Sequence, residues 1–243
     1  MHGGGCVFSG NILWLESVTS TNDVLKELAA QGAAEGTVVI AAEQTAGRGT
    51  GARSFFSPAG EGLYLSVLLR PKAELAQLFT MTGRTAVAVR RGIERACGAP
   101  CQIKWLNDIY LNGKKLCGIL AELSPDGSWV VLGVGVNLSQ SRESFAAQGL
   151  GEIATSLAAE GYLVTREELT RCILEELAEM YRLFPGGLEE CLAEYRAHCL
   201  TVGRQVEYTD GSVKRTGTAT AVDGDFALVV DGHAVRAGTV YLK

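Results

Sequence analysis

Residues 44–53 read Gln44-Thr45-Ala46-Gly47-Arg48-Gly49-Thr50-Gly51-Ala52-Arg53, and this stretch decides between fold classes. Its closely spaced glycines let the backbone approach a ligand and turn N–H groups toward an anion. Its two arginines suit phosphate or carboxylate oxygens, because a guanidinium donates in a planar fork. The composition alone leaves a second interpretation open, a solvent-exposed flexible loop whose arginines keep the chain soluble.

Two known phosphate-binding folds are excluded by what surrounds this stretch. The spacing Gly47-x-Gly49-x-x-Ala52 resembles a dinucleotide-binding fingerprint, which requires a helix to begin at once. Ser54-Phe55-Phe56-Ser57-Pro58 and a predicted strand follow instead, and the chain has no Walker A lysine pattern. We therefore expect a phosphate-binding loop outside both folds. Its glycine content predicts mobility between residues 47 and 60 that ends when a ligand binds.

Outward from this loop, the sequence pattern predicts strands and helices in mixed order before residue 200. Strands are expected at Ile12–Val18, Thr37–Ala42, Leu63–Leu69, Gln102–Trp105, Ile109–Leu111, Lys115–Leu123 and Trp129–Leu138. Asn112-Gly113 is a strong two-residue hairpin signal between two of them. Helices are expected from Ser20 to Gly32, from Leu75 to Cys97, from Thr165 to Phe184, and after Pro185-Gly186-Gly187 to about His198. Ser20 with Asp23, and Thr165 with Glu168, have the spacing of a helix capping box.

The residue pattern of the sequence changes after Gly203. Short β-rich runs alternate there with Asp/Gly turns, at Gln205–Tyr208, Gly217–Val222, Ala227–Val230 and Ala234–Leu242. This pattern is typical of a small β-barrel. We therefore predict a first domain over residues 1–200 and a C-terminal β-barrel domain over residues 201–243.

The composition limits the possible classes of protein. The chain has 243 residues, 47% of them hydrophobic, which suffices for one large and one small domain. Its net charge of −5, with scattered Lys and Arg, predicts no nucleic-acid binding. Seven cysteines without a C-x-x-C motif, and three distant histidines (His2, His198, His233), favour reduced thiols in the cytoplasm over disulfides or zinc. We expect no signal peptide and no membrane span, since no apolar stretch approaches the roughly 20 residues that a span needs.

Two further segments could carry chemistry. In Lys104-Trp105-Leu106-Asn107-Asp108, a lysine at a strand end can stabilise negative charge on a phosphoryl oxygen. The alternative is a strand-edge lysine before an ordinary turn. In Gly118–Glu122 and Gly133–Asn137, glycines inside strands mark close approach by a ligand, or else a bulge or tight sheet packing. Asn137 could bind a purine edge or cap a turn.

Taken in order, these segments resemble the biotin–protein ligases. The matching residues are Ser20-Thr21-Asn22, Ala46-Gly47-Arg48-Gly49 with Arg53 and Phe56-Ser57-Pro58, Lys104-Trp105-x-Asn107-Asp108, Lys115-Leu116-x-Gly118-Ile119-Leu120-x-Glu122, and Gly133-x-Gly135-x-Asn137. Each motif alone is weak, but the ordered set is specific and covers the chain from about Asn11. Because the first motif lies close to Met1, the resemblance is to the monofunctional form without an N-terminal DNA-binding domain.

The resemblance implies an α+β fold. A mixed sheet with flanking helices, like the core of class II aminoacyl-tRNA synthetases, would be followed by a C-terminal Src-homology-3-like β-barrel. It also implies two steps: biotin's carboxylate attacks the α-phosphate of ATP to give biotinyl-5′-adenylate and pyrophosphate, and a carrier lysine then releases AMP. ATP and biotin would be substrates, Mg²⁺ is expected although its ligands are unknown, and the partner would be a biotin carboxyl carrier protein.

The resemblance further implies roles for individual residues. Lys104 and Arg48 would be the catalytic residues. The biotin-binding residues would be Ser20, Thr21, Asn22, Gln44, Gly47, Arg48, Gly49, Thr50, Lys104 and Gly118. ATP or the adenylate would meet Arg48, Arg53, Asn107, Gly135 and Asn137.

The chain departs from the family's pattern at four positions. Thr50 stands where many members carry a basic residue, Ala52 where glycine is frequent, Leu106 in place of proline, and Thr239 in place of glutamate. The first departure removes a cation from the loop that would hold the adenylate. We therefore expect the chain to release this intermediate quickly.

Three other functions stay open on the sequence. A lipoate–protein ligase shares the adenylation chemistry, but the Gly-Arg-Gly loop and the Lys-Trp-x-Asn-Asp run favour biotin. A biotin-responsive repressor is disfavoured by the acidic pI near 5.3. An inactive paralogue that only binds is disfavoured because Lys104 and Arg48 are both present. The chain could be a monomer or a homodimer formed through an exposed sheet edge.

Overall fold

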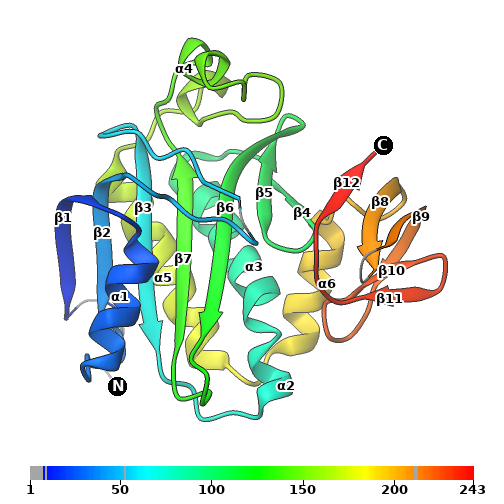
Figure 1. Cartoon of the computed structure of the whole chain (residues 1–243), viewed down its shortest axis with the longest axis horizontal. Helices are drawn as coiled ribbons and strands as arrows, with labels where there is room; N and C mark the ends of the chain where they lie inside the picture. Colours follow the sequence, from blue (N-terminus) through cyan, green and yellow to red (C-terminus); the bar gives the residue numbers. More distant parts are fainter. Residues whose placement is uncertain (1–7, 9, 52, 211–212) are drawn as a thin grey trace.

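A seven-stranded mixed sheet forms the centre of the molecule (Figure 1). The computed structural model describes residues 8, 10–51, 53–210 and 213–243. The strands follow the order β1 (Ile12–Val18), β2 (Val38–Gln44), β3 (Gly62–Leu69), β7 (Val130–Asn137), β6 (Lys114–Leu123), β5 (Asp108–Leu111) and β4 (Gln102–Lys104). Only the β1–β2 pair is parallel. The expected mixed sheet is therefore confirmed.

Helices cover both faces of this sheet. In Figure 1, α1 (Thr21–Ala30) crosses the front, while α3 (Met81–Cys97) and α5 (Arg166–Leu183) lie behind, and α6 (Leu188–His198) stands beside β4. Alternate residues of β2 point to opposite faces, so Val39 packs under α1 with Leu25, whereas Val38 and Ile40 join the larger core behind. All of β3 is buried because both of its faces are covered.

The hairpin between β5 and β6 follows the sequence prediction. Asn112 has φ 49° and Gly113 has φ 79°, the left-handed pair that a tight two-residue turn requires. The turn sets the pairing of β5 with β6, and β6 in turn pairs with β7 so that Gly118 faces Gly135. This register brings two glycines side by side on the sheet.

Two details of the predicted helices are wrong. The single helix expected from Leu75 to Cys97 is divided into α2 (Leu75–Leu78) and α3, because the Thr80 N–H and hydroxyl both donate to the Gln77 carbonyl and tighten one turn. The helix after Ser20 begins where expected, but the Ser20 hydroxyl makes no capping hydrogen bond. The Thr165 cap is confirmed, since its side chain accepts from the Glu168 N–H.

Residues 139–164 carried no prediction of regular structure. They form a short helix α4 (Arg142–Ala147) and a 3₁₀ turn η1 (Ala158–Glu160), drawn at the top of Figure 1. Backbone hydrogen bonds connect the segment to the seven-stranded sheet, between Lys115 and Ile153 and between Thr155 and Lys115. The segment therefore lies over the end of β6.

The C-terminal residues form a second sheet of five antiparallel strands. Its order is β11 (His233–Val235), β10 (Leu228–Val230), β9 (Val213–Val222), β8 (Gln205–Asp210) and β12 (Val240–Leu242). The single run expected from Ala234 to Leu242 is divided, because the chain turns at Gly238 with φ 106°. Within the described strands β11 and β12 do not pair, so the sheet has the order expected of a Src-homology-3-like unit without closing into a barrel.

The two sheets meet around Phe226, a turn residue between β9 and β10. Its ring packs against Gly83 of α3, where a Cβ atom would lie 2.6 Å from Phe226 Cε1, and edge-on to Tyr195 at 5.1 Å. The Trp105 indole N–H donates to the Phe226 carbonyl at 2.7 Å, and the Trp105 backbone N–H donates to Thr201 Oγ1 at 3.0 Å. The C-terminal sheet thus packs against the strand end that carries Lys104.

A buried arginine connects α3 to the turn between α5 and α6, and it gives a test of the helix packing behind the first sheet. Arg84 is 3% exposed and donates to Thr80 Oγ1, to the Gly186 carbonyl and to the Pro185 carbonyl. Arg84→Ala should lower the free energy of unfolding by about 3 kcal/mol, because two backbone carbonyls lose a charged donor and the buried space of the Arg84 side chain is left unfilled. Urea unfolding measures the change.

The matched control for this variant is Arg182→Ala. Arg182 pairs with Glu179 one turn earlier on α5 and its side chain is 66% exposed. An exposed helix pair of this kind contributes about 0.5 kcal/mol or less. Equal losses of stability in the two variants would contradict the structural role of Arg84.

Candidate active site

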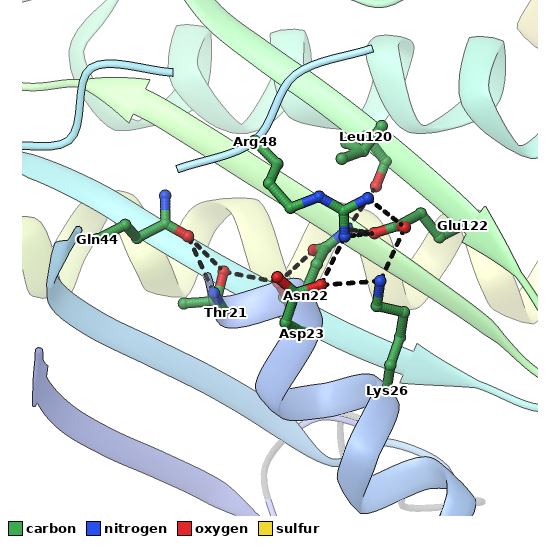
Figure 2. A network of polar contacts seen from close by, with 9 residues as sticks. Thr21, Asn22, Asp23, Lys26, Gln44, Arg48, Leu120 and Glu122 are labelled. Carbon is green, nitrogen blue, oxygen red and sulfur yellow. Dashed lines mark hydrogen bonds and ion pairs between the residues drawn. The ribbon is translucent and has the colours of Figure 1, made fainter. Parts of the chain in front are cut away.

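The first turn of α1 holds a buried polar cluster (Figure 2). Ser20, Thr21 and Asn22 are all buried where β1 runs into the helix. The Thr21 N–H donates to Gln44 Oε1 at 2.9 Å, and Gln44 Nε2 donates to Ser57 Oγ at 3.0 Å. Four residues predicted to bind biotin are therefore brought together: Ser20, Thr21, Asn22 and Gln44.

Ser66 completes this cluster and was missed in the sequence. Its hydroxyl lies 2.8 Å from Thr21 Oγ1 and 2.6 Å from Asn22 Oδ1. Asn22 Nδ2 in turn donates to Glu122 Oε2 at 2.8 Å and to the Leu120 carbonyl at 3.2 Å. A lone hydroxyl in the apolar run of β3 was the available signal, because buried polar groups need partners.

Four charged side chains close one side of the cluster, as Figure 2 shows. Arg48 reaches Asp23 at 2.5 Å and Glu122 at 3.0 Å, and Lys26 reaches the same two carboxylates at 2.8 and 2.9 Å. Burial alone would raise the pKa of Glu122, but hydrogen bonds from Asn22 and Lys26 and the neighbouring cations hold this pKa below its usual value. In this arrangement the positive charge of the Arg48 guanidinium is paired with the carboxylates of Asp23 and Glu122.

The glycine-rich loop folds back on itself. The Gly49 N–H donates to the Arg53 carbonyl and the Phe55 N–H donates to the Gly47 carbonyl, each at 2.8 Å. A Cβ atom on Gly47 would lie 2.6 Å from Ser57 Oγ, so only glycine fits there. The next regular element is β3, which confirms that no helix follows the loop.

A small cavity of about 30 Å³ adjoins the polar cluster. Ser20, Thr21, Asn22, Gln44 and Arg48 line one side, and Phe55, Leu120 and the strand segment Gly133–Gly135 line the other. Gly118 lies next to this cavity under the Phe55 ring. Five of the ten residues predicted to bind biotin therefore line this cavity, and Gly118 lies beside it.

A larger cleft of about 290 Å³ lies on the other side of Leu120, which borders both spaces. Thr50, Gly51 and Arg53 of the loop line it, together with the turn Trp105–Asn107. The segment Arg236–Thr239 of the C-terminal sheet forms its far wall. That wall was missed in the sequence, because nothing local in residues 236–239 signals a contact with the loop.

Lys104 lies at the end of β4, outside the linings of both spaces but electrostatically coupled to them. Burial lowers the pKa of its ammonium group, the charges of Lys115 and Arg53 lower it further, and Asp108 opposes the shift. The Asp108 carboxylate is itself paired with Lys115 Nζ at 2.7 Å. A nearby anion would therefore stabilise the charged form of Lys104 strongly.

Asn137 does not line either space. It is 4% exposed, its Nδ2 donates to the Thr155 carbonyl at 2.9 Å, and its Oδ1 accepts from Gln140 Nε2 at 3.4 Å. In this structure the side chain connects the end of β7 to the segment around α4. The predicted contact between Asn137 and ATP stays a prediction.

The described residues contain no group suited to binding a metal ion, and their cysteines are free thiols. Within residues 8, 10–51, 53–210 and 213–243, no group of three or more His, Cys, Asp or Glu side chains could hold a metal ion. The six cysteines in this part of the chain are free thiols, and Cys6 lies outside the described residues. None of the described helices is long and apolar enough to cross a membrane.

Comparisons with known proteins agree with this geometry. The family model for the biotin/lipoate A/B protein ligase family matches residues 14–137. The bifunctional ligase/repressor BirA of Bacillus subtilis is 34% identical over 93% of this chain and 70% of its own length. The biotin–[acetyl-CoA-carboxylase] ligase of Mycobacterium tuberculosis is 33% identical over 89% of this chain and 82% of its own.

A solved structure shows the same fold. The biotin protein ligase of Aquifex aeolicus, in complex with biotin and ATP, superposes with a TM-score of 0.80 at 27% identity, covering 96% of this chain and 99% of that one. The chain therefore belongs to the biotin/lipoate A/B protein ligase family. Within that family it resembles the biotin protein ligases of Mycobacterium tuberculosis and Aquifex aeolicus.

Proposed function

We propose that this chain uses ATP to attach biotin to one lysine of a biotin carboxyl carrier protein, through biotinyl-5′-adenylate. The observation that carries the proposal is the pair of adjoining spaces on either side of Leu120. The smaller is lined by amide and hydroxyl groups together with Arg48, and the larger is lined in part by Arg53 and Arg236. This arrangement suits a ligand with a polar ring system whose carboxylate must meet a phosphate. The biotin and ATP in the similar Aquifex aeolicus structure support the same assignment.

Biotin would occupy the smaller space. Its ureido ring has one carbonyl and two N–H groups, which must keep hydrogen bonds when buried. Ser20, Thr21, Asn22 and Gln44 supply such groups there. Gly118 would leave room for the ligand's rings on the sheet, and Gly47, Gly49 and Thr50 would close the loop over its acid end.

ATP would occupy the larger cleft. Arg53 and Asn107 line it, and Gly135 would lie where the two ligands meet. We propose that Mg²⁺ arrives with the triphosphate, because magnesium is usually held by substrate phosphates and few carboxylates. The described residues provide no acidic cluster that would hold it alone.

The first step joins the two ligands. A carboxylate oxygen of biotin attacks the α-phosphorus, the bond to the bridging oxygen breaks, and pyrophosphate leaves with that electron pair. Arg48 and Lys104 would hold the negative charge that two anions bring together. In the second step the neutral amine of the carrier lysine attacks the acyl carbon, AMP leaves, and the amine gives up a proton.

A direct assay tests the proposed function. The purified chain is incubated with Mg-ATP, a biotin carboxyl carrier domain and either biotin or lipoate, and the carrier is weighed by mass spectrometry. We expect an ATP-dependent mass gain of one biotinyl group on one lysine. A gain with lipoate alone would identify a lipoate ligase, and the absence of both attachment and biotin-dependent ATP–pyrophosphate exchange would leave only binding.

Thr50 gives a prediction about the intermediate. Arg53 folds back on Thr50, donating to its carbonyl at 3.1 Å and to its hydroxyl, so the loop presents little free positive charge. Thr50→Arg should slow the release of biotinyl-adenylate about tenfold, since one added charge contact of ~1.4 kcal/mol changes a constant by that factor. Release is measured by trapping labelled intermediate on filters. Equal release rates from the two proteins would refute the prediction.

Three expectations stay predictions from composition. The chain is expected to work in the cytoplasm, to bind no nucleic acid, and to be a monomer or a homodimer. The exposed edge strand β1, with Leu13 at 42% and Trp14 at 54% exposure, is where a second copy would pair.

A further inference from the structure

The Phe55 side chain lines the space that we assign to biotin. Its ring rests on Gly118 and Gly135, which face each other on β6 and β7. A Cβ atom on Gly135 would lie 2.7 Å from Phe55 Cε1, and one on Gly118 would lie 3.3 Å from Phe55 Cδ2. The ring therefore fills the room that the two missing side chains leave above the sheet.

The space beside this ring is too small for a ligand. Its volume of about 30 Å³ leaves room for only a few water molecules, since a cavity needs ~10–15 Å³ of such volume to hold one. Sites for small molecules typically measure ~300–1,000 Å³. Withdrawal of the Phe55 ring from Gly118 and Gly135 would open room for the two fused rings of biotin.

Contacts on several sides hold the ring in place. Tyr64 packs edge-on to it at 6.5 Å, and Lys115 Nζ lies 6.0 Å from its centre. The Phe55 N–H is bonded to the Gly47 carbonyl. At the other end of the loop, Arg48 is held by Asp23 and Glu122. The loop is therefore anchored at both ends by the protein's own groups.

We propose that Phe55 competes with biotin for the surface formed by Gly118 and Gly135, so that the ligand-free protein is closed by its own loop. The inference rests on the proposed function, because it takes biotin to be the ligand of this space. It differs from the expectation of a loop that stays mobile until binding. Since only the withdrawn state accepts ligand, the apparent affinity falls with the fraction of protein in that state. At high biotin concentration, withdrawal of the loop limits association.

Binding kinetics test the proposal with two matched variants. In the wild type, the observed binding rate should reach a plateau as the biotin concentration rises. In Phe55→Ala the plateau should disappear and the association rate constant should rise at least tenfold. Phe56→Ala removes the neighbouring ring, which packs on Phe145 at 6.3 Å, and should keep the wild-type plateau. If Phe55→Ala changed only the dissociation rate, Phe55 would merely line the bound ligand and the proposal would be overturned.

Hydrogen exchange of the ligand-free protein supplies a second test. The amides of Gly49 and Phe55 should be protected before any ligand is added, and Asp23→Asn, which loosens the hold on Arg48, should speed their exchange. Unprotected amides in the wild type would overturn the proposal. Protected amides together with no biotin binding in any variant would instead show that the loop is closed and that the proposed function is wrong.

Discussion

Replacing Lys104 with alanine should lower biotin-dependent ATP–pyrophosphate exchange about 100- to 1,000-fold at saturating substrates. Removal of one preorganised group that stabilises transition-state charge typically costs this much. Lys104 is suited to the role because burial lowers the pKa of its ammonium more than Asp108 raises it, so an approaching phosphate would further stabilise its charged form. Biotin affinity, measured by calorimetry without ATP, should change much less.

Two further variants test whether the effect depends on the position and shape of the Lys104 cation. Lys104→Arg keeps the charge but replaces a compact ammonium with a planar fork, and should recover only part of the rate. Lys72→Ala removes an exposed lysine in the turn after β3 and should leave exchange unchanged. Loss of biotin affinity with intact turnover at saturation would show that Lys104 binds substrate and does not assist the chemistry.

Replacing Gly133 with alanine should weaken biotin binding at least 100-fold, which corresponds to about 3 kcal/mol. The added Cβ atom would lie 2.9 Å from Asn22 Cγ and 3.0 Å from Asn22 Nδ2. Asn22 cannot move aside easily, because Ser66, Glu122 and the Leu120 carbonyl all hold its amide. The substitution should therefore disturb the whole polar cluster that we assign to the ureido ring.

This prediction needs a stability measurement beside it, since overpacking itself costs about 1–3 kcal/mol. Calorimetric titration of the folded variant gives the affinity, and urea unfolding gives the stability. Gly224→Ala is the matched control, because a Cβ atom there meets nothing within 4 Å. A folded Gly133→Ala protein that binds biotin as tightly as the wild type would show that Asn22 does not position the ligand.

Local signals in the sequence were enough to predict most strands of the catalytic sheet. The Asn112-Gly113 turn, the apolar runs of β2, β3 and β7, and the Thr165 cap depend on neighbouring residues, and the structure confirms each of them. The division at Thr80 could not be read in the same way. A helical apolar pattern continues through it, and at the break the Thr80 N–H and hydroxyl both bond to the Gln77 carbonyl.

The candidate site shows the same difference between residues found by local motifs and residues that come from distant strands. Ser20, Thr21, Asn22 and Gln44 were selected by their motifs and do meet in space. The partners of those residues come from distant strands, as with Ser66 and Glu122, and no local pattern predicts such pairing. The same is true of Asp23, whose spacing suggested a helix cap but whose carboxylate binds Arg48 and Lys26 instead.

The packing of Phe226 has a consequence for how the chain unfolds. Tyr208, Val222 and Leu228 of the C-terminal sheet belong to the same continuous core as Ile103 and Trp105 of the catalytic sheet. Because this core continues across residue 200, we expect the two sheets to unfold together in one cooperative transition. A chain truncated near residue 200 would lose the Phe226 carbonyl that accepts from the Trp105 indole N–H and would expose this part of the core to water, so we expect the C-terminal sheet to be needed for the first sheet to stay folded.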